Sequence, residues 1–281
     1  MKTILVPTDF SRSAENALLF ASLIALKTNT KIIILHAFQL PLPVAQISYE
    51  ILKDNTESKQ KEILEKLHLE GHKIKKSEEL NIEYHAIEGL ARNVILNFIN
   101  ERIIDYIVMG TNGFGKHTSG IFGSTTSHII ENANCPVIAI PEIASFNNEI
   151  KKITFATDFH AYDLYAIEKI KELASVFDAQ INILHISDTN IPNQEQQTMM
   201  YDFTKRVNAK LTYQNMSFQI IEGTDVETKL TEYIKNNETD MIVISTHFRN
   251  FLDKIFGKSI TKELVLKTTI PLVAFHYDNK V

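Results

Sequence analysis

A glycine- and hydroxyl-rich segment follows the apolar run Tyr106 to Met109 and holds the residue types best suited to bind an anion. Three of its glycines, Gly110, Gly113 and Gly123, have two and then nine residues between them. Glycine lets a backbone approach a ligand closely or adopt positive φ. Ser124 and Thr125 then begin a segment with helical spacing, where free backbone N–H groups and the helix dipole favour negative charge. The segment predicts a strand, a loop and a helix start that together hold a phosphate.

Two other interpretations of this segment stay open at this point. A purely structural turn also places glycines before a helix. The run from Gly110 to His117 also approaches a P-loop, but His117 stands where Mg²⁺ needs a Ser or Thr hydroxyl, and the loop follows a late strand. Lys116 and His117 either neutralise phosphate charge or lie in solvent. Of these interpretations we favour the first, a phosphate-binding loop of a kind other than the P-loop.

Strand-like and helix-like segments alternate along the first half of the chain. The expected strands are 4–6, 31–37, 81–87, 106–109 and 137–140, and the expected helices are 14–25, 48–72 and 91–100. Ser11 or Ser13 caps the first helix, and Gly71 ends the second. This rhythm predicts an α/β fold with a doubly wound parallel sheet. Because ligands bind beyond the carboxyl ends of such strands, the ends of the first and fourth strands should face one crevice.

The second half of the chain repeats the first. The segment Ile153 to Phe159 repeats Ile4 to Phe10 at an offset of 149 residues, and Ile183 to His185 repeats Ile34 to His36 at the same offset. Two agreeing offsets indicate an internal duplication. We therefore expect two copies of one domain, at residues 1–143 and 150–281.

Across its whole length the chain resembles a tandem universal stress protein. The resemblance is carried by the aspartate after each first strand (Asp9 and Asp158), by the Glu-Gly turn (Glu88-Gly89) and by the Gly-x2-Gly-x9-Gly-Ser signature that ends in Gly123-Ser124. It implies two Rossmann-like doubly wound sheets, each of five parallel strands in the order 3-2-1-4-5. It also implies an adenine nucleotide, ATP with Mg²⁺, as the ligand.

The resemblance assigns roles to residues by position. The nucleoside is expected to contact Pro7, Thr8, Asp9 and Ala37. The rest of the nucleotide is expected to contact Met109, Gly110, Gly113, Gly123, Ser124 and Thr125.

Asp9 also has a physical argument of its own. A carboxylate at the carboxyl end of a strand accepts hydrogen bonds from ribose hydroxyls or helps to hold Mg²⁺ against the phosphates. The alternative is that Asp9 caps the following helix. Asp158 repeats the residue in the second copy, which favours that structural role.

The second copy departs from the glycine signature. Ser245 and Phe248 stand where the first copy has glycines, and a phenylalanine both disfavours positive φ and fills the space that phosphate needs. We expect the second site to be degenerate. His247 and Asp158 suggest a metal site, but a surface or core histidine is favoured because no further ligands are evident.

Composition excludes several classes of protein. A net charge of −5 over 281 residues, with no strongly basic half, argues against a nucleic-acid surface. The single cysteine, Cys135, permits no disulfide framework. The sequence has no run of 18 apolar residues and passes from Met1-Lys2 straight into a strand, so we expect a cytoplasmic protein without a membrane partner.

The last strand of each copy is short and wholly apolar. Val137 to Ile140 and Leu272 to Phe275 each follow a proline and should form a sheet edge, which invites pairing. In the family such strands pair across a dimer. The resemblance therefore implies an intramolecular pseudo-dimer of the two domains, and a homodimer through another surface stays open.

Three functions fit these features. The first is an ATP-binding regulatory or stress-response protein, at most a slow ATPase, because no catalytic base can be assigned from the sequence. The second is an adenylyl-transferring or ATP-hydrolysing enzyme of a related class, although the segment Thr8 to Arg12 lacks the signature of the adenylyl-transferring families. The third is an assembly module that binds no nucleotide, which the intact glycine set argues against.

Overall fold

The computed structural model describes residues 2–40, 49–74, 79–111, 123–144, 149–187, 193–245 and 270–275. The chain divides into two compact units, of which the first ends at Glu142 and the second begins at Ile143. We call them the first and second domains. Within the described residues, no helix is both long enough and apolar enough to cross a membrane.

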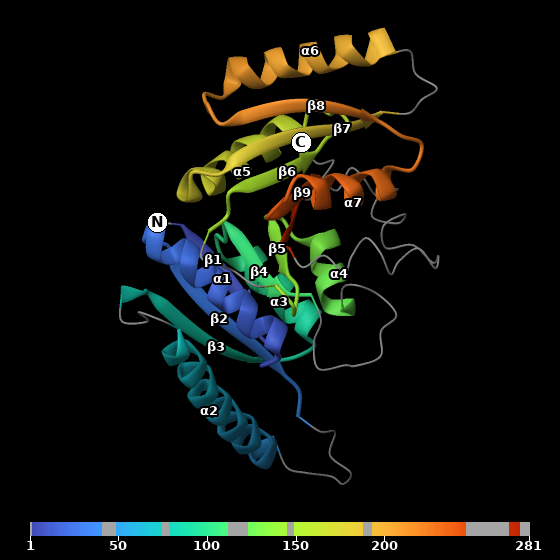
Figure 1. Ribbon diagram of the computed structural model, residues 1–281. Coiled ribbons are helices and arrows are strands. Elements are labelled where there is room, and N and C mark those ends of the chain that lie inside the picture. Colours follow the sequence, from blue (N-terminus) through green and yellow to red (C-terminus); the bar gives the residue numbers. More distant parts are fainter. Residues whose placement is uncertain are drawn as a thin grey trace. The chain divides into compact units, whose positions relative to one another are not determined.

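The first domain is built on parallel strands whose central members are buried on both faces. The strands are β1 (Thr3–Pro7), β2 (Lys31–Phe38), β3 (Ile82–Glu88), β4 (Tyr106–Gly110) and β5 (Val137–Ile140). Their order is β3-β2-β1-β4-β5, and each neighbouring pair is parallel. Aliphatic runs such as Ile32 to Leu35 are almost fully buried because helices cover both faces of the sheet (Figure 1). The predicted doubly wound order is confirmed.

Helices connect these strands at the places that the apolar spacing predicts. They are α1 (Arg12–Thr28), α2 (Tyr49–Lys73), α3 (Ala91–Glu101) and α4 (Ser124–Asn132). Ser11 caps α1 by accepting a hydrogen bond from the Ala14 amide, and Asn29 ends that helix in the left-handed conformation. Helices α1 and α2 lie on one face of the sheet, and α3 and α4 pack together on the other.

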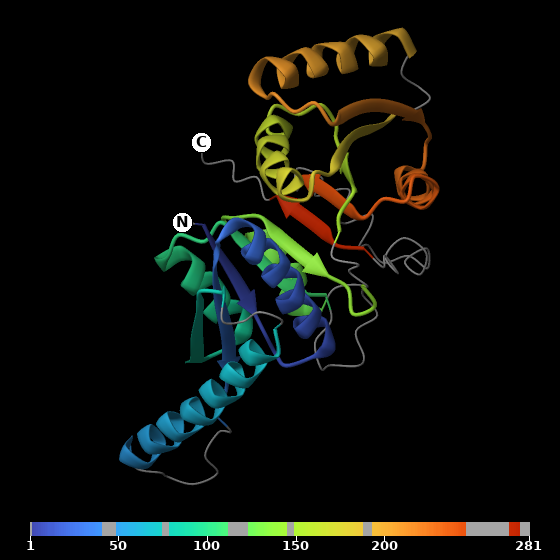
Figure 2. The same ribbon diagram turned by 60° about the vertical axis from the view of Figure 1, so that its left-hand side comes forward.

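The second domain repeats this architecture. Its strands are β6 (Lys152–Ala156), β7 (Gln180–Ser187), β8 (Met216–Glu222), β9 (Met241–Ser245) and β10 (Leu272–Phe275), and its helices are α5 (Asp163–Phe177), α6 (Asn193–Lys210) and α7 (Val226–Asn236). The parallel order β10-β9-β6-β7-β8 is the order of the first domain. Figure 2 shows α5 and α7 on opposite sides of these strands. The fold class predicted for both halves is confirmed, and the predicted pairing of β5 with β10 stays a prediction.

Gly71 does not end α2, as the sequence suggested. The helix continues to Lys73, and Gly71 is a buried position inside its last turns. A Cβ placed on Gly71 would collide with the hydroxyl of Tyr84 on β3. Glycine is therefore present because the tyrosine ring needs the space, and not because the backbone must turn.

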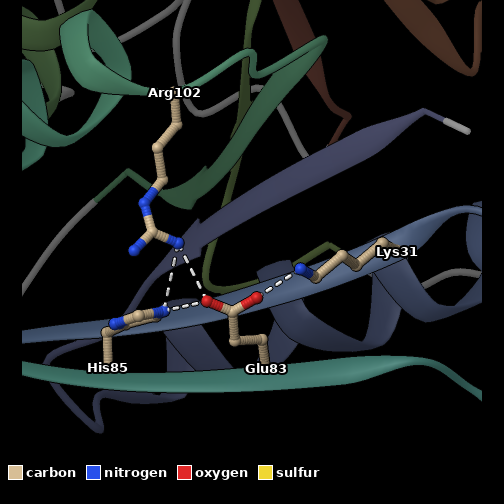
Figure 3. Close-up of polar contacts among 4 residues, drawn as sticks. All are labelled: Lys31, Glu83, His85 and Arg102. Atoms are coloured by element: carbon tan, nitrogen blue, oxygen red, sulfur yellow. Dashed lines mark hydrogen bonds and ion pairs between the residues drawn. The ribbon is translucent and has the colours of Figure 1, made fainter.

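A polar network joins β2, β3 and the end of α3 in the first domain. The Glu83 carboxylate pairs with Lys31, with His85 and with Arg102, the last at 2.8 Å (Figure 3). The Arg102 guanidinium also lies 4.4 Å from the centre of the Phe98 ring. Hydrogen bonds from Lys31 and then His85 lower the pKa of Glu83 to about 2. The network therefore surrounds the Glu83 carboxylate with cationic and imidazole donors from β2, β3 and the end of α3.

We expect Glu83→Gln to lower the free energy of unfolding at pH 7 by about 1 kcal/mol, because solvent screens a partly exposed network. The depressed pKa makes this stabilisation fully present above about pH 4.5, and it is lost as the pH falls toward 2. Urea unfolding at several pH values measures both effects. Glu57→Gln, in an exposed pair on α2, is the control and should change stability little. An equal loss at pH 2.5 and pH 7 would contradict the charge argument.

Candidate functional site

A cavity of about 290 Å³ lies at the carboxyl ends of β1 and β4 in the first domain. Parallel strands bring these ends to one edge of the sheet, where the strand order reverses. Nine of the ten residues predicted to hold a nucleotide line this cavity: Pro7, Thr8, Asp9, Ala37, Met109, Gly110, Gly123, Ser124 and Thr125. The tenth, Gly113, lies outside the described residues.

Sequence reasoning missed part of the lining. The missed residues are Ser11, Ser13, Ala14, Leu35, Ala91, Ile95 and Thr126. Most of them belong to the first turns of helices that follow β1 and β3. The topological rule that places strand ends at this edge also places the starts of the following helices there, and that signal was available in the sequence.

The amino ends of three helices converge on the cavity. Its wall includes the start of α1, the first residue of α3 (Ala91) and the first residues of α4. Leu90 and Gly123 precede α3 and α4 and provide no side-chain cap, and neither first turn contains an acidic residue. Free N–H groups and aligned peptide dipoles make such helix starts favourable for anions. No Lys, Arg or His belongs to the lining that the structure describes.

The contact between Gly110 and α1 leaves no room for a side chain. A Cβ on Gly110 would lie 2.5 Å from Ser13 Oγ, 2.6 Å from the Ser13 carbonyl carbon and 2.8 Å from the Ala14 nitrogen. On the opposite side, Thr126 Oγ1 donates to the Gly110 carbonyl at 2.8 Å. The end of β4 is therefore fixed between the starts of α1 and α4.

A strained turn follows β1. Phe10 has a φ of 63°, which is rare for a residue with a side chain, and its amide donates to Thr8 Oγ1 at 3.0 Å. His36 Nδ1 donates to the Thr8 carbonyl at 2.7 Å, and the His36 and Phe10 ring centres are 4.6 Å apart. Burial lowers the pKa of His36, so the ring is neutral when it holds the turn.

The hydrogen bonds of this turn show whether Asp9 caps the following helix. The Ser11 amide donates to Asp9 Oδ1 at 3.0 Å, and Ser11, not Asp9, is the N-cap of α1. The suggestion that Asp9 caps the helix is therefore wrong. The carboxylate closes a short side-chain turn at the rim of the cavity and remains exposed.

The second domain keeps the turn after its first strand. Phe159 has a φ of 62°, its amide donates to Thr157 Oγ1 at 2.9 Å, and His185 Nδ1 donates to the Thr157 carbonyl at 2.7 Å. The Phe159 and His185 ring centres are 4.2 Å apart. The turn is thus a property of the repeated fold and is not by itself a binding feature.

The residues around the equivalent cavity are larger in the second domain. Ser245 takes the place of Gly110, Ile186 that of Ala37, and Asp163 that of Ala14. Helix α5 begins at Asp163, two residues later in the repeat than α1, in the domain where position 245 carries a Cβ. The other sequence differences on which the predicted degeneracy rests, Phe248 among them, lie outside the described residues.

Asp163 closes the start of α5. Its carboxylate is 1% exposed and accepts from Thr157 Oγ1 at 2.6 Å and from the His160 amide at 3.2 Å. Burial raises the pKa of Asp163. Its second oxygen and the nearby Ser245 hydroxyl have no hydrogen bond of good geometry. A carboxyl group therefore occupies the helix start that in the first domain borders an open cavity.

The model of the universal stress protein family matches residues 1–141 and 149–276, almost the whole chain. The chain belongs to the universal stress protein family. A universal stress protein of Methanocaldococcus jannaschii, MJ0531, is 29% identical over 145 residues, which are 50% of this chain and 81% of that protein. The structure of a universal stress protein from Archaeoglobus fulgidus has 15% identity and a TM-score of 0.69, covering 99% of this chain and 97% of the other. That likeness shows a shared fold over both domains of this universal stress protein.

We expect Gly110→Ser to destabilise the first domain by about 1–3 kcal/mol, the usual cost of forcing atoms into a packed contact. The matched control is Ser245→Ala in the second domain, which removes a buried hydroxyl that makes no hydrogen bond of good geometry and should change stability by less than 1 kcal/mol. Urea unfolding monitored by circular dichroism measures both. A Gly110→Ser protein as stable as the parent would show that α1 moves away at little cost.

Proposed function

We propose that the first domain of this universal stress protein binds one adenine nucleotide, ATP with Mg²⁺, and that the protein is a nucleotide-dependent regulator in the stress response. The observation that carries the proposal is the cavity at the ends of β1 and β4, where the starts of α1, α3 and α4 converge. A cavity that offers backbone N–H groups and no basic side chain suits a phosphorylated ligand held by the backbone.

The lining divides into two parts that match the two ends of a nucleotide. Thr8, Asp9 and Ala37 form a part with small and polar side chains, suited to the nucleoside. Ser124 and Thr125 begin α4 and suit the phosphates. The volume of about 290 Å³ is close to the lower end of the range of roughly 300–1,000 Å³ for ligand sites.

Mg²⁺ would enter with the phosphates. The cation keeps several waters and usually takes only one or two protein carboxylates in addition to phosphate oxygens. Asp9 is the carboxylate that the described lining offers, so its chemistry fits either of two roles, acceptance from the ribose hydroxyls or a contact with hydrated Mg²⁺. When bound, Mg²⁺ neutralises phosphate charge, while the helix starts orient the phosphates.

The lining supports binding more than catalysis. Asp9 is the titratable side chain of the described lining, and one of its oxygens already accepts from the Ser11 amide. A general base needs a second group that orients it and a position beside the attacking water. This favours a regulatory role over the alternative of an adenylyl-transferring or ATP-hydrolysing enzyme.

The differences between the repeats support a site in the first domain only. Ala37, Gly110 and Ala14 leave the first cavity open, and each is replaced by a larger residue in the second domain. Buried Asp163 also places a carboxyl group at the start of α5, where an anion would otherwise be favoured.

Calorimetry with Mg-ATP tests the proposal, with an expected stoichiometry near one nucleotide per chain. Ala37→Ile copies the residue of the second domain and should reduce binding at least tenfold, because the larger side chain fills the cavity. Ile186→Ala, the reverse change in the second domain, is the control and should leave binding unchanged. A stoichiometry near two, or no binding, would overturn the proposal.

We expect Asp9→Ala to weaken nucleotide binding by roughly 1–3 kcal/mol, the usual loss for a hydrogen bond to a charged group, or about 5- to 150-fold in affinity. Asp158→Ala is the matched control and should leave affinity unchanged. If Asp9→Ala lowers only the melting temperature, the carboxylate serves the turn alone.

A further inference from the structure

A second cavity, of about 430 Å³, lies next to the first one. It is a groove between the turn after β1 and the last turns of α2. Its lining is Asp9, Phe10, Lys66, Leu69, Glu70 and Lys73. Asp9 belongs to both cavities, so the groove meets the nucleotide cavity at that residue.

The second domain shows how the same place is filled by protein. There the Phe159 ring contacts His185, and its centre is also 5.4 Å from that of Phe203 on α6. Phe203 is fully buried and Phe159 is only 7% exposed. Arg206 Nη2 donates to the Phe159 carbonyl at 3.4 Å and its guanidinium lies over the Phe203 ring. An aromatic pair thus closes the groove of the second domain.

Among the residues that the structure describes, the first domain has no such closure, although its turn is the same. Phe203 and Val207 lie seven and three residues before the end of α6, and Lys66 and Glu70 hold those places in α2. Phe10 keeps its contact with His36. At the place of Phe203, however, α2 has Lys66 and no aromatic side chain, and Phe10 is only half-buried. An apolar ring is therefore left facing a groove.

The charges of the groove are balanced. Lys66 Nζ donates a hydrogen bond to Glu62 Oε1 at 2.6 Å. Lys73 Nζ donates to Glu70 Oε1 at 2.5 Å and lies 3.7 Å from Glu15 Oε1. Each ammonium has three N–H donors, while Asp9 and Glu70 present acceptor oxygens. Paired donors and acceptors around an apolar ring match the polar edge and flat face of a nucleobase better than they match a free anion.

We propose that this groove binds a second nucleobase, stacked on Phe10 in the place that Phe203 takes on Phe159, so that the ligand is a dinucleotide. Its first nucleotide lies in the neighbouring cavity, and to that extent the inference rests on the proposed function. Asp9, shared by both cavities, lies at the junction of the two nucleosides. The second domain has Phe203 at the one place and larger side chains around the other, and we expect it to bind neither part of the ligand.

Calorimetry with AMP and with the linear dinucleotide pApA tests this inference. The parent protein should bind pApA roughly 5- to 150-fold more tightly than AMP, the gain expected for one stacked base. Lys66→Phe copies Phe203 and closes the groove, so pApA affinity should fall to that of AMP while AMP affinity stays unchanged. Lys61→Phe, an exposed position on the same helix, is the control and should retain the preference for pApA.

A fluorescence experiment locates the second base. The chain contains no tryptophan, so Phe10→Trp introduces a single reporter at the floor of the groove. The tryptophan fluorescence of the Phe10→Trp protein should be quenched by pApA and not by AMP. Adding Lys66→Phe to this protein should abolish the quenching. If Lys66→Phe fails to fold, Phe10→Leu takes its place in the test. It removes the ring and should also remove the preference for pApA.

The outcomes separate the two proposals. Equal affinities for AMP and pApA in the parent protein would overturn the groove assignment and leave the nucleotide site in place. A protein that binds neither AMP nor pApA would overturn both. Tight pApA binding that survives both Lys66→Phe and Phe10→Leu would place the second base elsewhere and overturn the groove assignment.

Discussion

The contact between the end of β4 and the start of α1 determines the geometry of the first domain's site. Because Gly110 has no Cβ, the first turn of α1 rests directly on the strand, and Ser13 and Ala14 face the cavity. In the second domain Ser245 stands in place of Gly110, and α5 starts two residues later in the repeat than α1 does. The domain with glycine at this place has a helix amino end that borders an open cavity, and the domain with serine has a helix start occupied by the Asp163 carboxyl group. In α/β folds this position is sensitive because strand ends and helix starts share one crowded edge.

The two domains act as an internal comparison, because they share a backbone and differ in selected side chains. Both keep the strained turn with a phenylalanine at positive φ and a histidine bonded to the preceding carbonyl. Strain of this kind persists only where the surroundings over-determine it, and here buried rings and hydrogen bonds do so in both copies. The turn therefore belongs to the fold. What differs is the size of the residues around it: Ala14, Ala37 and Gly110 line the cavity of the first domain, and larger residues stand at those places in the second.

Much of the first domain could be predicted from the sequence. The doubly wound parallel sheet followed from the alternation of elements, while the family resemblance implied the strand order and the contact residues. Nine of those ten residues line one cavity because strand ends meet at one edge. The capping role of Asp9 was wrong because a cap depends on where a helix starts, and either Ser11 or Asp9 satisfies the residue preference. The role of Gly71 was also wrong, since its reason is the hydroxyl of Tyr84, far away in the sequence. The groove could not be found either, because it depends on which side chains of α2 face the turn after β1.

Open cavities cost stability, and the comparison between the domains shows where. Ile186, Phe203 and Val207 belong to the second domain, while the first domain has Ala37, Lys66 and Glu70 at those places. Fully burying a large apolar side chain contributes about 1.5–3 kcal/mol. Phe203 and Val207 are fully buried, so at these two places the first domain forgoes several kcal/mol of apolar burial that its repeat retains. A ligand that filled both cavities would bury part of this apolar surface. It would stabilise the folded state by an amount that grows with the logarithm of its concentration relative to its dissociation constant. Binding of the proposed ligand would therefore couple the folding of the first domain to ligand concentration and leave that of the second domain unaffected. Such an asymmetry would suit the proposed regulatory role, because one domain would respond to the ligand while the other stayed constant.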